Sequence, residues 1–144
     1  MSFGDLIRKR KDRKERAKRG WSDSDVWDFD DWFLRTVPAM LDRFREISIS
    51  IPSSVMKDVF DERKEEFGLE DVDFLVWPRD KEKREKMKTI ESEARRRWHN
   101  VLEMIATLLR RAEKEWDDGN YEAMNEPKNE AFALLSKWFF DLWT

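Results

Sequence analysis

The stretch MKTIESEARRRWHNVLEMIATLLRRAEKEW, residues 87–116, decides the fold of this chain. Apolar residues recur in it every three or four positions, which places them on one face of an α-helix. They are Met87, Ile90, Ala94, Trp98, Val101, Leu102, Ile105, Leu108, Leu109, Ala112 and Trp116. This stripe predicts a single helix over about residues 79–117, about 58 Å long at 1.5 Å per residue. A compact globule of this size is roughly 35–40 Å across, so we expect an elongated bundle or an end covered by another subunit.

The chain before this helix also has helical periodicity. Residues 2–19 predict a short amphipathic start followed by a solvated basic helix. A core helix is expected over about residues 25–47, kinked at Pro38, then an extended linker over residues 48–52. The apolar face of that core helix consists of Val26, Phe29, Phe33, Val37, Met40, Leu41, Phe44 and Ile47.

A third helix is expected over residues 54–67, capped by Gly68. Residues 69–78 then predict an apolar connection that packs across the bundle and ends at Pro78. The last helix is expected to start at Pro127 and to run to about Trp143. The predicted fold class is all-α, an elongated bundle of about five helices. Residues 1–20 form a basic arm, and residues 21–144 form one bundle domain.

The last helix is apolar over most of its circumference. Its main face consists of Ala131, Leu134, Leu135, Trp138, Phe139 and Leu142, while Phe132, Phe140 and Trp143 project elsewhere. A helix of this kind is buried on more than one side. We therefore predict a homo-oligomer with Phe132, Phe140 and Trp143 at its interface.

Composition excludes several classes of function. The chain has no cysteine, which removes disulfides, thiolate zinc sites, iron–sulfur clusters and thiol catalysis, and favours a reducing compartment. No apolar run approaches the roughly 20 residues that span a bilayer, so no membrane partner is expected. Residues 1–20 carry nine Lys/Arg against three Asp/Glu, whereas the chain as a whole has a net charge of −3. Eight tryptophans are an excess that any functional hypothesis must explain.

Five aspartates lie within the nine residues from Asp23 to Asp31. Hard carboxylate oxygens can bind a divalent cation, but the glycine and the closing glutamate of a calcium-binding loop are missing. Aspartates at a helix start also complement the helix dipole and cap free backbone N–H groups. We expect capping here, with no metal and no cofactor.

The same region carries a family resemblance. Residues 19–30, RGWSDSDVWDFD, followed by Pro38, Leu41, Arg43 and Phe44, resemble a group of small uncharacterised proteins of tailed phages and prophages. Residues 98–105, WHNVLEMI, are similar to a second signature of that group. The resemblance covers about half the chain and implies a phage origin. It brings no activity with it.

Basic and aromatic residues lie close together at several positions. A planar ring with guanidinium groups suits a nucleotide, because the base stacks and the phosphates accept forked hydrogen bonds. The candidate ligand-binding residues are Trp21, Trp27, Trp32, Arg35, Arg43, Arg95, Arg97, Trp98 and His99. A solvated helix face is the alternative for the arginines, with an ion pair between Glu91 and Arg95.

Catalytic signatures are missing from the sequence. His99 is the only histidine, and there is no phosphate-binding glycine loop, nucleophile elbow or paired-carboxylate motif. We do not expect an enzyme. The leading hypothesis is a phage-encoded, self-associating binding protein of the host cytoplasm that sequesters a nucleotide immune signal, the immune role being an analogy with other small viral sponges. The alternatives are a protein-interaction module, which assists phage assembly or inhibits a host protein, and nonspecific nucleic-acid binding by the basic helix.

Overall fold

A computed structural model describes residues 2–143, which form helices and no strands. The helices are α1 (Phe3–Arg19), α2 (Asp23–Trp27), α3 (Phe29–Ile47), α4 (Ser53–Arg63), α5 (Asp71–Leu75), α6 (Lys81–Asp117) and α7 (Tyr121–Trp138), followed by a 3-10 turn, η1 (Phe139–Asp141). The all-α class and the single long helix are confirmed. None of the helices within residues 2–143 has the length and apolarity needed to span a membrane.

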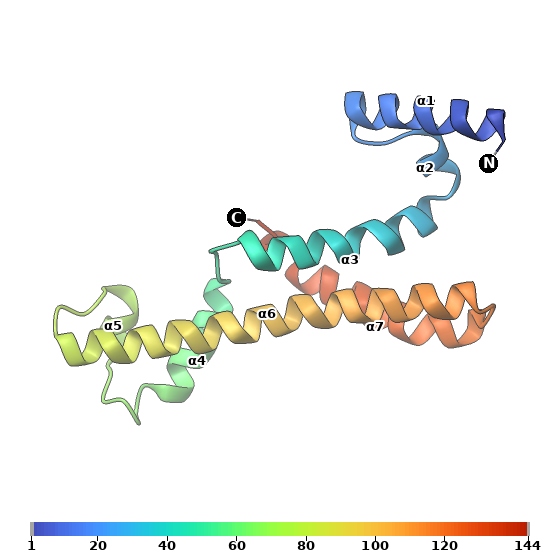
Figure 1. Cartoon of the computed structure of the whole chain (residues 1–144). Coiled ribbons are helices and arrows are strands. Elements are labelled where there is room, and N and C mark those ends of the chain that lie inside the picture. Colours follow the sequence, from blue (N-terminus) through green and yellow to red (C-terminus); the bar gives the residue numbers. More distant parts are fainter. Residues whose placement is uncertain (1, 144) are drawn as a thin grey trace.

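The 37-residue helix α6 is the spine of the molecule. Figure 1 shows α3, α4 and α7 lying along it in an elongated arrangement, with α5 beside its first turns. The apolar stripe of α6 is buried at most positions from Met87 to Ala112, as its spacing predicted. Val101 and Leu108 are half-buried, and Trp116 at its end is 39% exposed, so the expected core position of Trp116 is wrong. The core that results consists of Leu41, Val55, Val59, Phe60, Leu69, Met87, Ile90, Ala94, Trp98, Leu102, Ile105, Ala106, Leu109, Ala131 and Trp138.

The expected helix over residues 25–47 is divided in two. Asp28, with φ −119° and ψ 51°, ends α2 and precedes α3. Polar contacts with α1 fix the direction of α2: Arg16 donates to Asp25 at 2.6 and 2.9 Å, and the Ser24 hydroxyl donates to Asp12 at 3.0 Å. These contacts link residues nine and twelve positions apart, so helical periodicity could not reveal the break. The basic residues 3–19 form α1, and α1 and α2 together form a hairpin.

The segment 69–78 differs from its prediction. It contains the short helix α5, and only part of it packs: the Phe74 ring lies 5.2 Å from the Phe60 ring. Leu75, Val76 and Trp77 are exposed, so the expected packing across the bundle is wrong for them. A capping box between Glu70 and Asp73 starts the helix, a signal that the apolar pattern obscured.

The last helix starts six residues before Pro127. Gly119 turns the chain with φ 77°, and α7 begins at Tyr121. Pro127 lies buried inside the helix, where its ring packs in the core and offsets the lost backbone hydrogen bond. The helix ends at Trp138, short of the expected Trp143, and η1 follows it.

Candidate functional site

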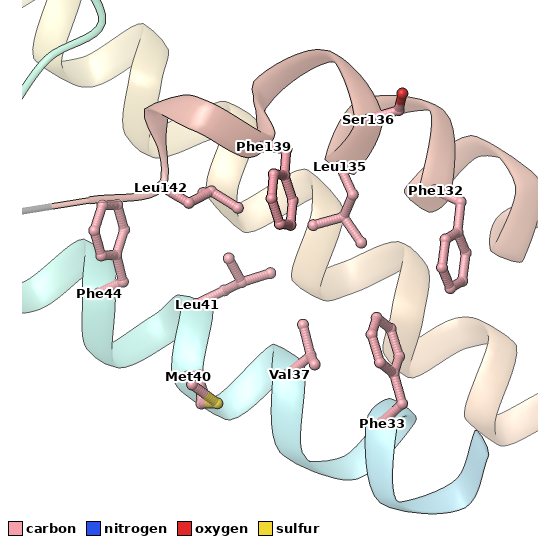
Figure 2. Close-up of a pocket in the computed structure, with 10 residues that line it drawn as sticks. All are labelled: Phe33, Val37, Met40, Leu41, Phe44, Phe132, Leu135, Ser136, Phe139 and Leu142. Carbon is pink, nitrogen blue, oxygen red and sulfur yellow. The ribbon is translucent and has the colours of Figure 1, made fainter. Parts of the chain in front are cut away.

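An apolar groove lies between α3 and α7, which both pack on α6. Its larger section, the main pocket, has a volume of about 490 Å³. The lining residues are Phe33, Val37, Met40, Leu41, Phe44, Phe132, Leu135, Ser136, Phe139 and Leu142. Figure 2 shows Phe33, Val37 and Leu41 of α3 facing Phe132 and Leu135 of α7 and Phe139 and Leu142 beyond it, while the Ser136 side chain points away from them. Ser136 is the one polar residue among them, and none is charged.

A second section, the end pocket, continues the groove toward the start of α3 and has a volume of about 370 Å³. Its lining consists of Phe29, Asp30, Phe33, Leu34, Ala112, Trp116, Met124, Lys128 and Phe132. Phe33 and Phe132 belong to both sections, and their rings stack at 5.3 Å with an interplanar angle of 16°. The two stacked rings lie between the main pocket and the end pocket and line both of them.

The local sequence explains why the groove stays open. On α3, Pro38 and Leu41 are buried, while Met40 is 62% exposed on the neighbouring side of the helix. On α7, Ala131 and Trp138 are buried, while Phe139 just beyond the helix is 63% exposed. Each helix therefore has one apolar face against α6 and a second one turned toward the groove.

Two contacts hold the walls of the groove in place. Asp42 of α3 pairs with Arg110 of α6, which lowers the pKa of the Asp42 carboxyl below its ordinary value. The Ser50 hydroxyl donates to the Trp143 carbonyl at 2.7 Å, tying the end of the chain to the linker after α3. The second contact fixes the segment that carries Leu142 against the main pocket.

The nine residues predicted to bind a ligand do not form one pocket. Trp98 is 1% exposed, with its ring 5.3 Å from Trp138, so it is a core residue. Arg97 is held by Glu62 and Glu93 across the contact of α4 with α6. Successive helical residues project about 100° apart, which is why neighbours in sequence end up in different surroundings.

Arg95 and His99 also lie on α6, away from the groove. Arg95 forms the expected ion pair with Glu91 at 3.2 Å and donates to the Ile49 carbonyl at 3.1 Å. Burial and the nearby Arg95 and Arg45 lower the pKa of His99, so its imidazole is neutral at pH 7. Arg43 pairs with Glu46 at 3.0 Å on the surface of α3.

The remaining four candidates lie near the α1–α2 hairpin, in two places. Trp21 and Trp32 line a small pocket of about 270 Å³. Trp27, 87% exposed, and Arg35 line a more polar cleft of about 570 Å³. The other residues of that cleft are Arg8, Lys9, Asp12, Arg16, Ser24 and Asp28.

The residues predicted at an oligomer interface are exposed in the single chain. Phe132 is 47%, Trp143 63% and Phe140 89% exposed. Phe132 contributes to both sections of the groove, whereas Phe140 packs edge-on against Phe139 at its rim. Most of the groove was not predicted from the sequence. One feature of the sequence pointed to the groove: the apolar residues of α3 cover a wider arc of the helix than packing against α6 alone can bury.

The acidic segment after Gly20 serves local structure. The Ser22 side chain and Asp25 form a capping box at the start of α2, and Asp23 pairs with Lys11 and Arg19. No group of three or more metal-ligating side chains gathers anywhere in residues 2–143. The expected capping role is confirmed at Ser22 and Asp25.

We predict that Asp25→Asn releases α1 from α2. The Arg16 guanidinium holds the pKa of Asp25 well below its ordinary value, with hydrogen bonds from Ser22 adding to the effect. A lowered folded-state pKa stabilises the hairpin fully above the unfolded pKa of about 3.9, and the contribution is lost as pH falls through the folded value. Amide hydrogen exchange of α1 should therefore accelerate in the variant at neutral pH.

The control is Asp23→Asn, since Asp23 is half exposed and its ion pairs are weaker. It should change the exchange of α1 much less. Equal exchange in both variants and the unmodified chain would show that the Arg16–Asp25 pair does not hold the hairpin together.

Comparison with known proteins adds no further assignment. No family model, curated protein or solved structure matches this chain.

Proposed function

We propose that this chain is a protein-interaction module whose groove between α3 and α7 receives an amphipathic helix of a partner protein. The observation that carries the proposal is the main pocket, about 490 Å³ lined by nine apolar residues and one serine. Exposed apolar surface of this extent costs free energy in water unless something covers it.

The dimensions of the groove suit a helix. From Phe33 to Phe44 the α3 wall spans twelve residues, about 16 Å or three helical turns at 1.5 Å per residue. Two helices that lie on a common third one leave a furrow between them, into which another helix can set its ridge of side chains. Anchors at positions i, i+3 or i+4, and i+7 of the partner would meet Val37, Leu135 and Phe139.

The chemistry of the main pocket fits an apolar partner better than a nucleotide. Phosphate groups need cationic or N–H donors, and no charged side chain lines this pocket. Burying a charged ligand there without partners would be strongly unfavourable. The apolar side chains of a helix carry no such penalty.

A photo-crosslinker at Phe139 tests the proposal in the cells that produce the protein. A photoreactive phenylalanine analogue there should form an adduct with a partner, and the attachment site should map to one face of an amphipathic helix. The matched control places the analogue at Met104, 56% exposed on α6 and outside the groove. No adduct at Phe139, or the same adducts from both positions, would contradict the proposal.

The second candidate function is nucleotide sequestration, supported by the polar cleft at the hairpin. Trp27 presents an almost fully exposed indole beside Arg8, Arg16 and Arg35. Asp25 already holds Arg16, and Asp31 holds Arg35, so a phosphate would compete with carboxylates there. A panel of cyclic and linear nucleotides should raise the melting temperature of the unmodified chain but not of Trp27→Ala. No shift with any nucleotide would remove this candidate.

A further inference from the structure

The outer face of α1 has no partner within its own chain. At 100° per residue, Phe3, Leu6, Ile7, Arg10, Arg13, Lys14 and Ala17 share an arc of about 120°. The first three are apolar and exposed, at 80%, 54% and 56%. Arg10, Arg13 and Lys14 are exposed and form no ion pair with any residue from 2 to 143. The opposite face holds the ion pairs with α2.

A surface of complementary character borders the end pocket. Asp30 lines this pocket, and Asp31, Glu113 and Asp117 interact electrostatically beside it. Burial raises the pKa of Glu113, and the nearby Asp117 and Asp31 add to this effect, while Arg35 and Arg110 oppose it. Asp30, Glu113 and Asp117 form no ion pair within residues 2–143. The pocket lining is mainly apolar, with Phe29, Leu34 and Trp116 among its residues, and Lys128 is its one cation beside Asp30.

We propose that the end pocket of one copy of this chain receives the outer face of α1 from a second copy. Phe3, Leu6 and Ile7 would enter the apolar pocket. Arg10, Arg13 and Lys14, one to two turns further along, would face the acidic residues beside it. The inference rests on the proposed function, since the end pocket is one section of the groove. It assigns helix α1 of a second copy as the segment that binds in that section.

The chain's own α1 cannot reach this pocket in the observed arrangement. Figure 1 shows α1 on the far side of α3 from α6 and α7, whereas the end pocket is lined from α3, α6 and α7. Contacts between the inner face of α1 and α2, chiefly Arg16 with Asp25, hold these two helices together. A second copy can satisfy the outer face without breaking these contacts.

Charge exchange between two variants of the full chain tests the inference. R10E/R13E/K14E reverses the basic face, and D30K/D117K reverses the acidic one. All five side chains are exposed, so both variants should keep the helical circular dichroism of the unmodified chain. Analytical ultracentrifugation measures the mass of the particle in solution, which is compared with the 17.6 kDa of one chain.

The unmodified chain should assemble at low salt and dissociate at high salt, because screening weakens exposed charge pairs. Each variant alone should associate more weakly, its apparent Kd rising by about tenfold or more. A mixture of the two should regain the assembly. R84E/R96E, which alters two exposed arginines of α6 outside the groove, should assemble like the unmodified chain.

A mixture that remains monomeric, or a variant that assembles unchanged by itself, would overturn the inference. Docking of α1 onto the end pocket of its own chain would also overturn the inference. In that case the unmodified chain would sediment as a monomer, and amide hydrogen exchange of α1 would become faster in the charge-reversed variants. The cross-link at Phe139 is independent of this result. If the Phe139 cross-link forms but the mixed variants do not assemble, the proposed function is supported and the contact between two copies is wrong. If the mixed variants assemble but Phe139 gives no cross-link, the contact between two copies is supported and the partner helix in the main pocket is not.

Discussion

Replacing Trp98 by alanine should lower the free energy of unfolding by about 3–5 kcal/mol, the largest effect on stability that we expect from one substitution. Trp98 is 1% exposed in the middle of α6, and its ring meets Trp138 of α7 at 5.3 Å. Removing the indole leaves a cavity that the α6–α7 contact can fill only in part. Chemical denaturation followed by circular dichroism measures the change.

Two further variants give this prediction its controls. Trp27→Ala removes an indole that is 87% exposed, and should change stability by no more than about 0.5 kcal/mol. Trp98→Phe should cost less than Trp98→Ala, because it keeps a ring and removes the Nε1–H, which is buried without a hydrogen-bond partner. If Trp98→Ala proved as harmless as Trp27→Ala, Trp98 would not be a core residue.

Met40→Glu should reduce the yield of the Phe139 cross-link by about 30-fold, equivalent to about 2 kcal/mol of binding free energy. Met40 is 62% exposed in the free chain, so the carboxylate is tolerated while the groove is open. A helix seated in the main pocket would bury that carboxylate with no cation in the lining to pair with it. The free energy of unfolding of the isolated chain should stay nearly unchanged.

Met104→Glu is the matched control, since it introduces the same charge at a similarly exposed methionine of α6. Its cross-link yield should equal that of the chain with the Phe139 analogue alone. A similar loss in both variants would mean that net charge, and not occupancy of the groove, controls the adduct.

Local periodicity predicted the parts of the fold that depend on one helix at a time. The stripe from Met87 to Trp116 predicted residues 79–117, and α6 spans Lys81–Asp117. The extended linker after Ile47 is also as expected, whereas the third helix ends at Arg63 instead of Phe67, and Gly68, with φ 65°, closes the turn that follows it. These features are set by side-chain spacing and backbone conformation within a few residues, so the sequence carries them directly.

Features set by contacts between distant residues were not predictable in the same way. The break at Asp28 follows from pairing of α2 with α1, and α7 starts six residues before Pro127, which is buried inside the helix. Trp98 and Arg97 look like a ring beside a cation in the sequence, yet one is buried and the other pairs with Glu62. A ligand site could not be assigned without knowing which face of each helix is buried and which is exposed to solvent.

The aromatic excess gave the most useful hint about function. A chain with more large rings than one small bundle can hide must expose some, and Trp27, Phe139, Phe140 and Trp143 are more than half exposed. The sequence therefore indicated that the folded chain exposes large aromatic side chains. It did not indicate that α3 and α7 line one groove together, because that depends on how both helices pack on α6.

Methionine oxidation by dilute peroxide tests most directly whether the groove is a covered interface. Met40 and Met104 are 62% and 56% exposed, and an exposed thioether is oxidised readily to the sulfoxide. In dilute purified chain the two should therefore react at similar rates, as measured by mass spectrometry. In intact cells that contain the partner, Met40 should be protected relative to Met104. Equal oxidation of the two residues in cells would show that the groove stands open there and would contradict the account.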